Sequence, residues 1–206
     1  MNPPLPDPDP PPAPATEHPG WAHRVRSHLK RSWQSHLSTL AVALAAMVAV
    51  QAWQTRDAPR GVAPAFSALL VANGAAPAML AADGHIGLDE WRAAHPGRAV
   101  AVHIWSDWCP FCRAEEGSVT AVAADWPVLT VASRSGDATQ VTRWMAQRGL
   151  NWATAIDPAG QVARTYGLAV VPAWVVVAPD GHISSVATGY TTELGMRARL
   201  WWAQGW

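Results

Sequence analysis

The chain has 206 residues, which suits one domain of ordinary size with an added segment and not two full domains. Fifteen basic residues balance fifteen acidic ones, so no bulk electrostatic field favours binding to nucleic acid. The two cysteines are too few for a scaffold of structural disulfides, which needs several pairs spread along the chain.

Residues 1–22 begin with MNPPLPDPDPPPAPATEHPG, a stretch in which proline removes backbone donors and blocks helix formation. We predict a disordered cytoplasmic tail here, and the alternative is a proline-rich ligand for a partner domain. The next segment, residues 23–36, is basic and is predicted to lie beside a membrane. Its cationic residues are Arg24, Arg26, Lys30 and Arg31.

Residues 37–53 (LSTLAVALAAMVAVQAW) carry no charge and, as a helix, are long enough to cross the hydrocarbon core of a bilayer. Trp33 and Trp53 bracket the stretch, as interfacial aromatic residues do. The basic segment precedes it, and positive residues favour the cytoplasmic side. We therefore predict a single-pass transmembrane signal anchor in the inner membrane, with the N-terminus in the cytoplasm and the C-terminal domain in the periplasm.

Two alternatives to this anchor are open. A cleavable signal peptide would be cut near Val50-Gln51-Ala52, but the region before the apolar stretch is longer than in usual signal peptides. A buried helix of a soluble domain is the second alternative. Beyond the anchor, the composition of residues 54–64 predicts a linker, and residues 65–206 have the length of a domain.

The predicted domain alternates strands with helices. AVAVHIW, residues 99–105, is a compact apolar run that predicts a buried strand, and the CPFC segment after it starts a helix, with Pro110 tolerated in the first turn. Further strands are predicted at 127–133, at 151–157 and as a pair over 170–189, helices at 88–95, 137–149, 158–167 and 191–204, and a small hairpin at 79–87. This order predicts an α/β fold with a mixed sheet between two layers of helices.

Both cysteines lie at the predicted junction between strand and helix. The unpaired amides and the dipole of a helix N-terminus stabilise an anion there, and the thiolate of Cys109 is such an anion. Cys112 lies about one helical turn further, so its sulfur can resolve a mixed disulfide formed by Cys109. A zinc site needs two more ligands, and no histidine pair stands near the cysteines. An inert pair of buried thiols is the other alternative.

The segment WSDWCPFCRAE, followed about sixty residues later by VVPAWVVVAPDGHI, resembles the thioredoxin-like superfamily. More narrowly, it is similar to the membrane-anchored TlpA/DsbE/ScsD-like protein disulfide oxidoreductases. The resemblance covers about residues 65–204 and includes LDEWR, HPGRAVAVHIW, AIDPAGQVARTYGL and the APDG turn. It implies a thioredoxin-like mixed sheet flanked by helices, preceded here by a single N-terminal transmembrane helix.

The resemblance also assigns roles to residues at matching positions. Cys109 matches the attacking cysteine and Cys112 the resolving one. Val171-Pro172 matches the loop whose proline is cis in this fold, which implies that the Val171 backbone lies beside the cysteines and pairs with an extended substrate. Trp108 resembles the tryptophan that flanks the active site.

Two titratable residues stand near the cysteines in the sequence, and His103 is the candidate for moving protons. In thioredoxins an acidic residue stands six residues before the first cysteine, and here that position holds His103. This histidine is either a proton acceptor for Cys112 or a satisfied histidine of the core. Glu115 matches an acidic position that follows CxxCR in this branch, and it either accepts a hydrogen bond or is solvated.

Pro110 and Phe111 separate the cysteines and offer no side-chain donor to a thiolate, whereas DsbA-type oxidants have a histidine there. Stabilising the reduced form makes a pair more oxidising, so we expect a comparatively reducing pair that reduces or isomerises substrate disulfides. The family implies protein thiol or disulfide substrates and a DsbD/CcdA-type membrane electron donor. A DsbA-like oxidant, a Cu(I)-binding copper-tolerance module and an interaction domain with a vestigial thiol pair are the alternatives. No cofactor or metal site is predicted.

Overall fold

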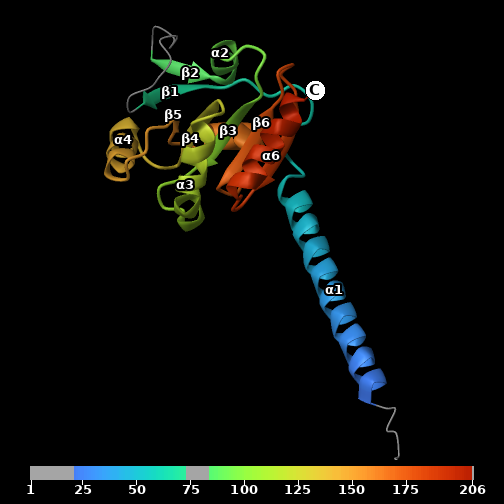
Figure 1. Cartoon of the computed structure of the whole chain (residues 1–206). Coiled ribbons are helices and arrows are strands. Elements are labelled where there is room, and N and C mark those ends of the chain that lie inside the picture. Colours follow the sequence, from blue (N-terminus) through green and yellow to red (C-terminus); the bar gives the residue numbers. More distant parts are fainter. Residues whose placement is uncertain (1–20, 73–83, 206) are drawn as a thin grey trace, which may run out of the picture. The chain divides into compact units, whose positions relative to one another are not determined.

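The computed structural model describes residues 21–72 and 84–205 (Figure 1). The contacts divide the chain into two units, one that ends at Met47 and one that begins at Val48. The predicted tail falls almost wholly on residues 1–20, which lie outside the described part. The predicted hairpin at 79–87 also lies in part outside it.

Helix α1, Trp21–Gln54, contains the predicted membrane segment. Its part from His36 to Gln54 is long and apolar enough to cross a membrane, and none of it is buried inside the protein. It is the single stretch among the described residues with these properties. The helix therefore fits the predicted single transmembrane helix, and it also includes the whole of the basic segment 23–36 that precedes the apolar stretch.

The described residues form one seven-stranded sheet in the order β2-β1-β5-β4-β3-β6-β7. Strands β3, β4 and β5 are parallel, whereas β1, β2, β6 and β7 join by antiparallel pairing, so the sheet is mixed as predicted. The strands are β1 Ser67–Ala72, β2 His85–Gly87, β3 Val100–Trp105, β4 Val128–Ser133, β5 Ala153–Asp157, β6 Ala173–Val177 and β7 Ile183–Thr188.

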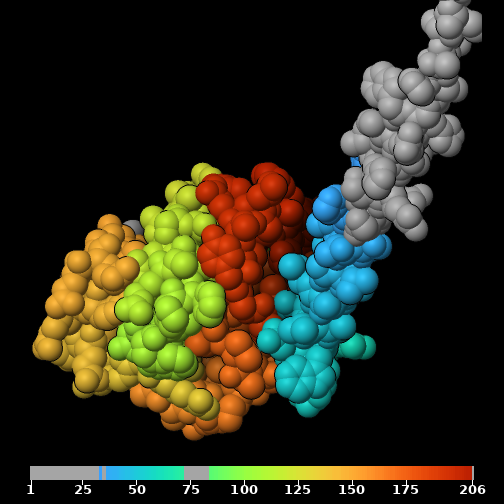
Figure 2. Space-filling view, turned by 90° about the horizontal axis from the view of Figure 1, so that it is seen from below, coloured from blue at the N-terminus to red at the C-terminus, as the bar shows by residue number. Residues whose placement is uncertain are grey.

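Two apolar layers enclose the sheet, because successive side chains of a strand point to opposite faces. In β3, Ala101 and Trp105 join the layer under three helices, and Val102 and Ile104 join the layer on the other face. Helices α3 Pro110–Ala123, α4 Ala138–Gln147 and α6 Glu193–Gln204 contribute to the first layer, and α2 Leu88–Ala93 and α5 Gln161–Thr165 to the second. Figure 2 shows α4, α3 and α6 in this order across one face.

Strand β1 was not predicted from the sequence. It pairs antiparallel with β5 and with β2, so the observed partner of the strand at His85–Gly87 is Ser67–Ala72. The chain also joins the sheet earlier than the predicted domain boundary. The amide of Ala63 donates to the carbonyl of Gly181 at 2.9 Å, and Val62 bridges to His182 in the turn between β6 and β7.

Candidate active site

The CPFC segment lies where β3 ends and α3 begins. Cys109 is the N-cap residue of α3, with an extended backbone (φ −84°, ψ 115°), and Pro110 takes the first helical position. Proline suits this position because its missing N–H has no helical partner in any case. The Sγ of Cys109 accepts a hydrogen bond of 3.1 Å from the amide of Cys112. The sulfur therefore occupies the place of a capping oxygen, where a thiolate is stabilised.

The loop before Cys109 is tied to the end of the neighbouring strand β4. Ser106 donates through its hydroxyl to the carbonyl of Ser133 at 2.6 Å. The indole N–H of Trp108 donates to the carbonyl of Arg134 at 3.2 Å. These bonds join the two parallel strands at their carboxyl ends, and so they position the first turn of α3.

A second loop, which leads into β6, lies against the first cysteine. The Val171–Pro172 peptide bond is cis. The carbonyl of Val171 lies 3.7 Å from the Sγ of Cys109, within reach of a thiol hydrogen bond. The carbonyl of Pro172 accepts from the amide of Gly189 at 2.8 Å, which joins this loop to the end of β7.

The sulfurs are covered while their neighbours are exposed. Cys109 and Cys112 are 2% and 3% exposed and form no disulfide with each other. Trp108 and Phe111 are 60% and 62% exposed, so large aromatic side chains stand in solvent on both sides of the first cysteine. A partner that reaches Cys109 therefore meets an apolar rim.

Burial raises the pKa of the Cys112 thiol well above its ordinary value. The side chain of Cys109 raises it further, the Ser106 backbone lowers it, and the negative charge of Glu115 adds a smaller increase. At neutral pH the thiol of Cys112 therefore keeps its proton, and it needs a base before it can act as a nucleophile.

Glu115 is wholly buried, one turn beyond Cys112 on the inner face of α3. One carboxylate oxygen, Oε1, accepts a hydrogen bond from the amide of Thr191, so the first of the two alternatives for this residue is the one observed. Burial raises the pKa of Glu115 to about 7, although the Thr191 amide and the Trp174 indole act in the opposite direction. The carboxyl group thus exchanges its proton near neutral pH.

His103 lies in the aromatic layer below α3 and is fully buried. Its ring centroid is 4.9 Å from that of Trp174 and 6.3 Å from that of Trp152. Burial lowers the pKa of His103 to about 3, and the nearby backbone of Ala173 opposes this only in part. The ring therefore stays neutral over the physiological range, as a core histidine does, and it is a far weaker base than Glu115.

The structure brings eight of the nine predicted site residues to one edge of the sheet and leaves His103 in the layer beneath. They are Trp108, Cys109, Pro110, Phe111, Cys112, Glu115, Val171 and Pro172. Sequence reasoning missed Trp174 and Thr191, which both act on Glu115. Trp174 follows Pro172 by two residues, and in an extended segment this spacing places both side chains on the same face. The sequence therefore offered a signal for Trp174. Thr191 carries no such signal. Among the side chains that the structure describes, no three His, Cys, Asp or Glu residues form a group that could hold a metal ion.

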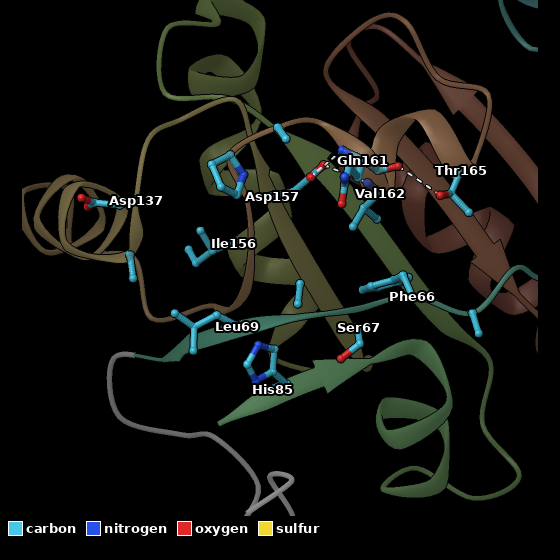
Figure 3. Close-up of a pocket in the computed structure, with 15 residues that line it drawn as sticks. Phe66, Ser67, Leu69, His85, Asp137, Ile156, Asp157, Gln161, Val162 and Thr165 are labelled. Atoms are coloured by element: carbon cyan, nitrogen blue, oxygen red, sulfur yellow. Dashed lines mark hydrogen bonds between the residues drawn. The ribbon is translucent and has the colours of Figure 1, made fainter. Parts of the chain in front are cut away.

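A cavity of about 580 Å³ lies elsewhere, between β1, β2 and β5 and the helices α4 and α5 (Figure 3). None of the predicted site residues lines it. The carboxylate of Asp157 on its wall accepts from the amides of Gln161 at 2.6 Å and Val162 at 3.1 Å. This acid therefore serves to cap α5.

Solved structures define the class of fold. The chain resembles a secreted thiol-disulfide isomerase from Corynebacterium glutamicum with a TM-score of 0.57 and 16% identity, over 69% of this chain and 85% of that one. It resembles a thioredoxin-family thiol:disulfide interchange protein from Chlorobium tepidum with a TM-score of 0.55 and 20% identity, over 72% and 99%. The predicted thioredoxin-like fold is confirmed.

Residues 62–186 match the AhpC/TSA family, and the chain belongs to that family. It is 29% identical to a thioredoxin-like protein of Haemophilus influenzae over 50% of this chain and 62% of the relative. It is 30% identical to a DsbE homolog, a thiol:disulfide interchange protein of Paracoccus denitrificans, over 48% and 55%. The chain thus spans little more than half the length of these relatives. The similarity to TlpA/DsbE-like proteins is confirmed.

Proposed function

We propose that this protein is a membrane-anchored periplasmic thiol–disulfide oxidoreductase whose redox pair is Cys109 and Cys112. The observation that carries the proposal is the position of the Cys109 sulfur. It caps α3, accepts the Cys112 amide at 3.1 Å and lies 3.7 Å from the Val171 carbonyl. The relatives named thiol:disulfide interchange proteins support the same chemistry.

Exchange proceeds in two displacements. The Cys109 thiolate attacks one sulfur of a substrate disulfide, which forms a mixed disulfide and releases the first substrate sulfur as a thiolate that takes up a proton. The Cys112 thiolate then attacks the Cys109 sulfur, which closes the Cys109–Cys112 disulfide and releases the second substrate thiolate. Two electrons pass from the protein to the substrate, and the reverse sequence would oxidise a dithiol.

Glu115 supplies the base for the second displacement. The Cys112 thiol is buried and holds its proton at neutral pH, and the carboxylate one turn away takes this proton as the thiolate forms. A group whose pKa is about 7 is suited to this role, because it is partly ionised at neutral pH and still basic enough to accept. His103, with its pKa near 3, is not the acceptor in this scheme.

The expected direction of electron flow is reduction or isomerisation of substrate disulfides. Pro110 and Phe111 give the thiolate no side-chain donor, and the local donor to Cys109 is the backbone amide of Cys112. A pair whose thiolate is less stabilised is more reducing. Continued turnover then needs electrons from the membrane, for which a DsbD/CcdA-type donor is the proposed partner, and the substrates are protein disulfides.

The proposed location follows from the apolar helix. The segment His36–Gln54 would cross the inner membrane, with the basic residues before it on the cytoplasmic side and the domain in the periplasm. The name of one solved neighbour, a secreted isomerase, is in keeping with a domain that works outside the cytoplasm. The proline-rich segment 1–22 would then be a cytoplasmic tail.

The proposal is tested on the full chain in detergent by reduction of insulin disulfides. We expect no turnover for Cys109→Ser, and for Cys112→Ser we expect trapped mixed disulfides because resolution fails. Alkylation of acid-quenched cells measures the direction, since a mostly reduced pair indicates a reductant and a mostly oxidised pair an oxidant. Full exchange activity of Cys109→Ser, or a pair that faces the cytoplasm, would refute the proposal.

A further inference from the structure

Several buried polar atoms beneath the cysteines have no hydrogen-bond partner among the described residues. Proteins leave few such atoms, because an unpartnered buried donor or acceptor is costly. In the layer under α3 these atoms are Glu115 Oε2, Trp174 Nε1, Trp105 Nε1 and both ring nitrogens of His103. This set includes a carboxylate oxygen that only accepts when ionised and indole groups that only donate.

Trp174 is held firmly in this layer. It lies on β6, is 1% exposed, and stands directly opposite His103 in the register between β3 and β6. The two rings pack at a centroid distance of 4.9 Å with an angle of 31° between their planes. The paired strands fix both backbones, so His103 supports one face of the indole and limits its rotation.

The indole of Trp174 also acts on Glu115. It lowers the pKa of this carboxyl group, and so it favours the ionised form. The Thr191 amide occupies the other oxygen, Oε1, which leaves Oε2 as the acceptor that lacks a partner. One unpartnered acceptor and one unpartnered donor therefore meet in the same buried place.

Few other charges bear on this carboxylate. The titratable group that Glu115 acts on is the Cys112 thiol of the same helix, and the buried His103 on β3 is neutral. Thr191 and Trp174 do not titrate in this range. The buried face of α6 is apolar and consists of Met196, Leu200 and Ala203. Arg197 of the same helix is bound to Glu193, Asp125 and the carbonyl of Ala121.

We propose that Trp174 is a positioning residue for the proton transfer in thiol–disulfide exchange: its indole N–H donates to Oε2 of Glu115 when the carboxylate is ionised. The bond aligns the carboxylate that takes the proton from the Cys112 sulfur, while the thiolate so formed attacks the Cys109 sulfur. When Glu115 is protonated, the carboxyl group carries no charge and the bond weakens. This inference rests on the proposed function.

The test compares Trp174→Phe with Trp105→Phe in the full chain. Each change removes one buried, unpartnered indole N–H from the same layer and keeps an aromatic ring, but it is the indole of Trp174 that acts on the carboxyl group of Glu115. Loss of a donor to the ionised carboxylate raises its pKa by about one unit. We expect the pH–rate profile of Trp174→Phe to move upward by about one unit, with about a fivefold loss of rate at pH 7. The profile of Trp105→Phe should stay in place.

A second measurement needs no change to the fold. In the reduced wild-type chain, the indole N–H resonance of Trp174 should move with pH as Glu115 titrates, and this movement should vanish in Glu115→Gln. An indole resonance that ignores pH would overturn the proposal. So would equal shifts of the rate profile in both tryptophan variants, or a shift caused by His103→Phe alone, which would make His103 the donor. If Cys109→Ser keeps its activity, the proposed function fails, but the indole titration still reports on the pair.

Discussion

The amide of Cys112 donates a hydrogen bond of 3.1 Å to the Sγ of Cys109. The donor belongs to the backbone of α3, so it is present whatever side chains separate the two cysteines. Pro110 and Phe111 add no second donor. A side-chain donor introduced at position 110 or 111 can therefore stabilise the Cys109 thiolate further. Such a change should raise the reduction potential of the pair without removing the backbone donor.

We expect Phe111→His to make the pair more oxidising, because a histidine next to the helix N-terminus can donate to the thiolate and stabilise the reduced form. A hydrogen bond to a charged group contributes about 1.5–3 kcal/mol, which corresponds to roughly 30–60 mV for this two-electron couple. Phe111 is 62% exposed, so the exchange should not disturb the core. Equilibration with glutathione buffers measures the potential, and Phe111→Leu is the control that should leave it unchanged.

Glu115→Gln should slow the closure of the Cys109–Cys112 disulfide by about 10²-fold at pH 7, because the variant has no base for the Cys112 proton. The wild-type rate should rise with pH through the pKa of Glu115, about 7, and then level off. The rate of the variant should instead continue to rise with hydroxide. Stopped-flow kinetics of mixed-disulfide resolution gives both profiles, and identical profiles would exclude Glu115 as the acceptor.

His103 should make the fold sensitive to acid. In the unfolded chain its imidazole takes up a proton below pH 6.5, whereas in the folded protein burial lowers its pKa to about 3. The unfolded state therefore binds more protons in this window, and the contribution of His103 to the free energy of unfolding should fall by up to about 1.4 kcal/mol per pH unit from pH 6.5 towards 3. Below pH 4.5, where Glu115 adds no opposite contribution, His103→Phe should remove this slope in denaturant titrations of the full chain.

Glu115 should change the free energy of unfolding with pH in the opposite direction to His103, so it provides the control for that prediction. Its folded pKa is about 7 and its ordinary value is 4.5, so the folded state binds more protons between these values. The free energy of unfolding should therefore fall as pH rises from 4.5 to 7. Glu115→Gln should remove this contribution, so the rise of the free energy of unfolding with pH that His103 causes should appear steeper. In a variant with both changes, neither contribution should remain.

Asp157→Ala should destabilise the domain by about 1–3 kcal/mol, because the buried carboxylate satisfies amides at the start of α5. Asp137 provides a matched case, since it caps α4 through the amide of Gln140 at 2.9 Å but on the surface. Asp137→Ala should lower the free energy of unfolding by about 1 kcal/mol or less. Equal losses in the two variants would show that burial of the capping acid does not matter.

Local patterns predicted most of the domain. The apolar runs before Cys109 and after Pro172 are strands, since short continuous apolar segments bury well inside a sheet. Thr192 and Asp137 cap the helices predicted at 191–204 and 137–149, and residues 179–181 turn between β6 and β7. The sequence did not predict strand β1, because SALLVA has no alternating pattern of its own. Its partners, β2 and β5, lie on separate segments of the chain.

The sequence by itself determined that two cysteines stand one turn apart at the start of a helix, behind an uncharged segment long enough to cross a bilayer. Those features depend on residues close together in the chain. Only the tertiary structure decided that Glu115 is buried, that Thr191 binds it from 76 positions away and that Trp174 adjoins it. Proton affinity depends on the charges and dielectric around a group, and these come from strands and loops that only folding brings together.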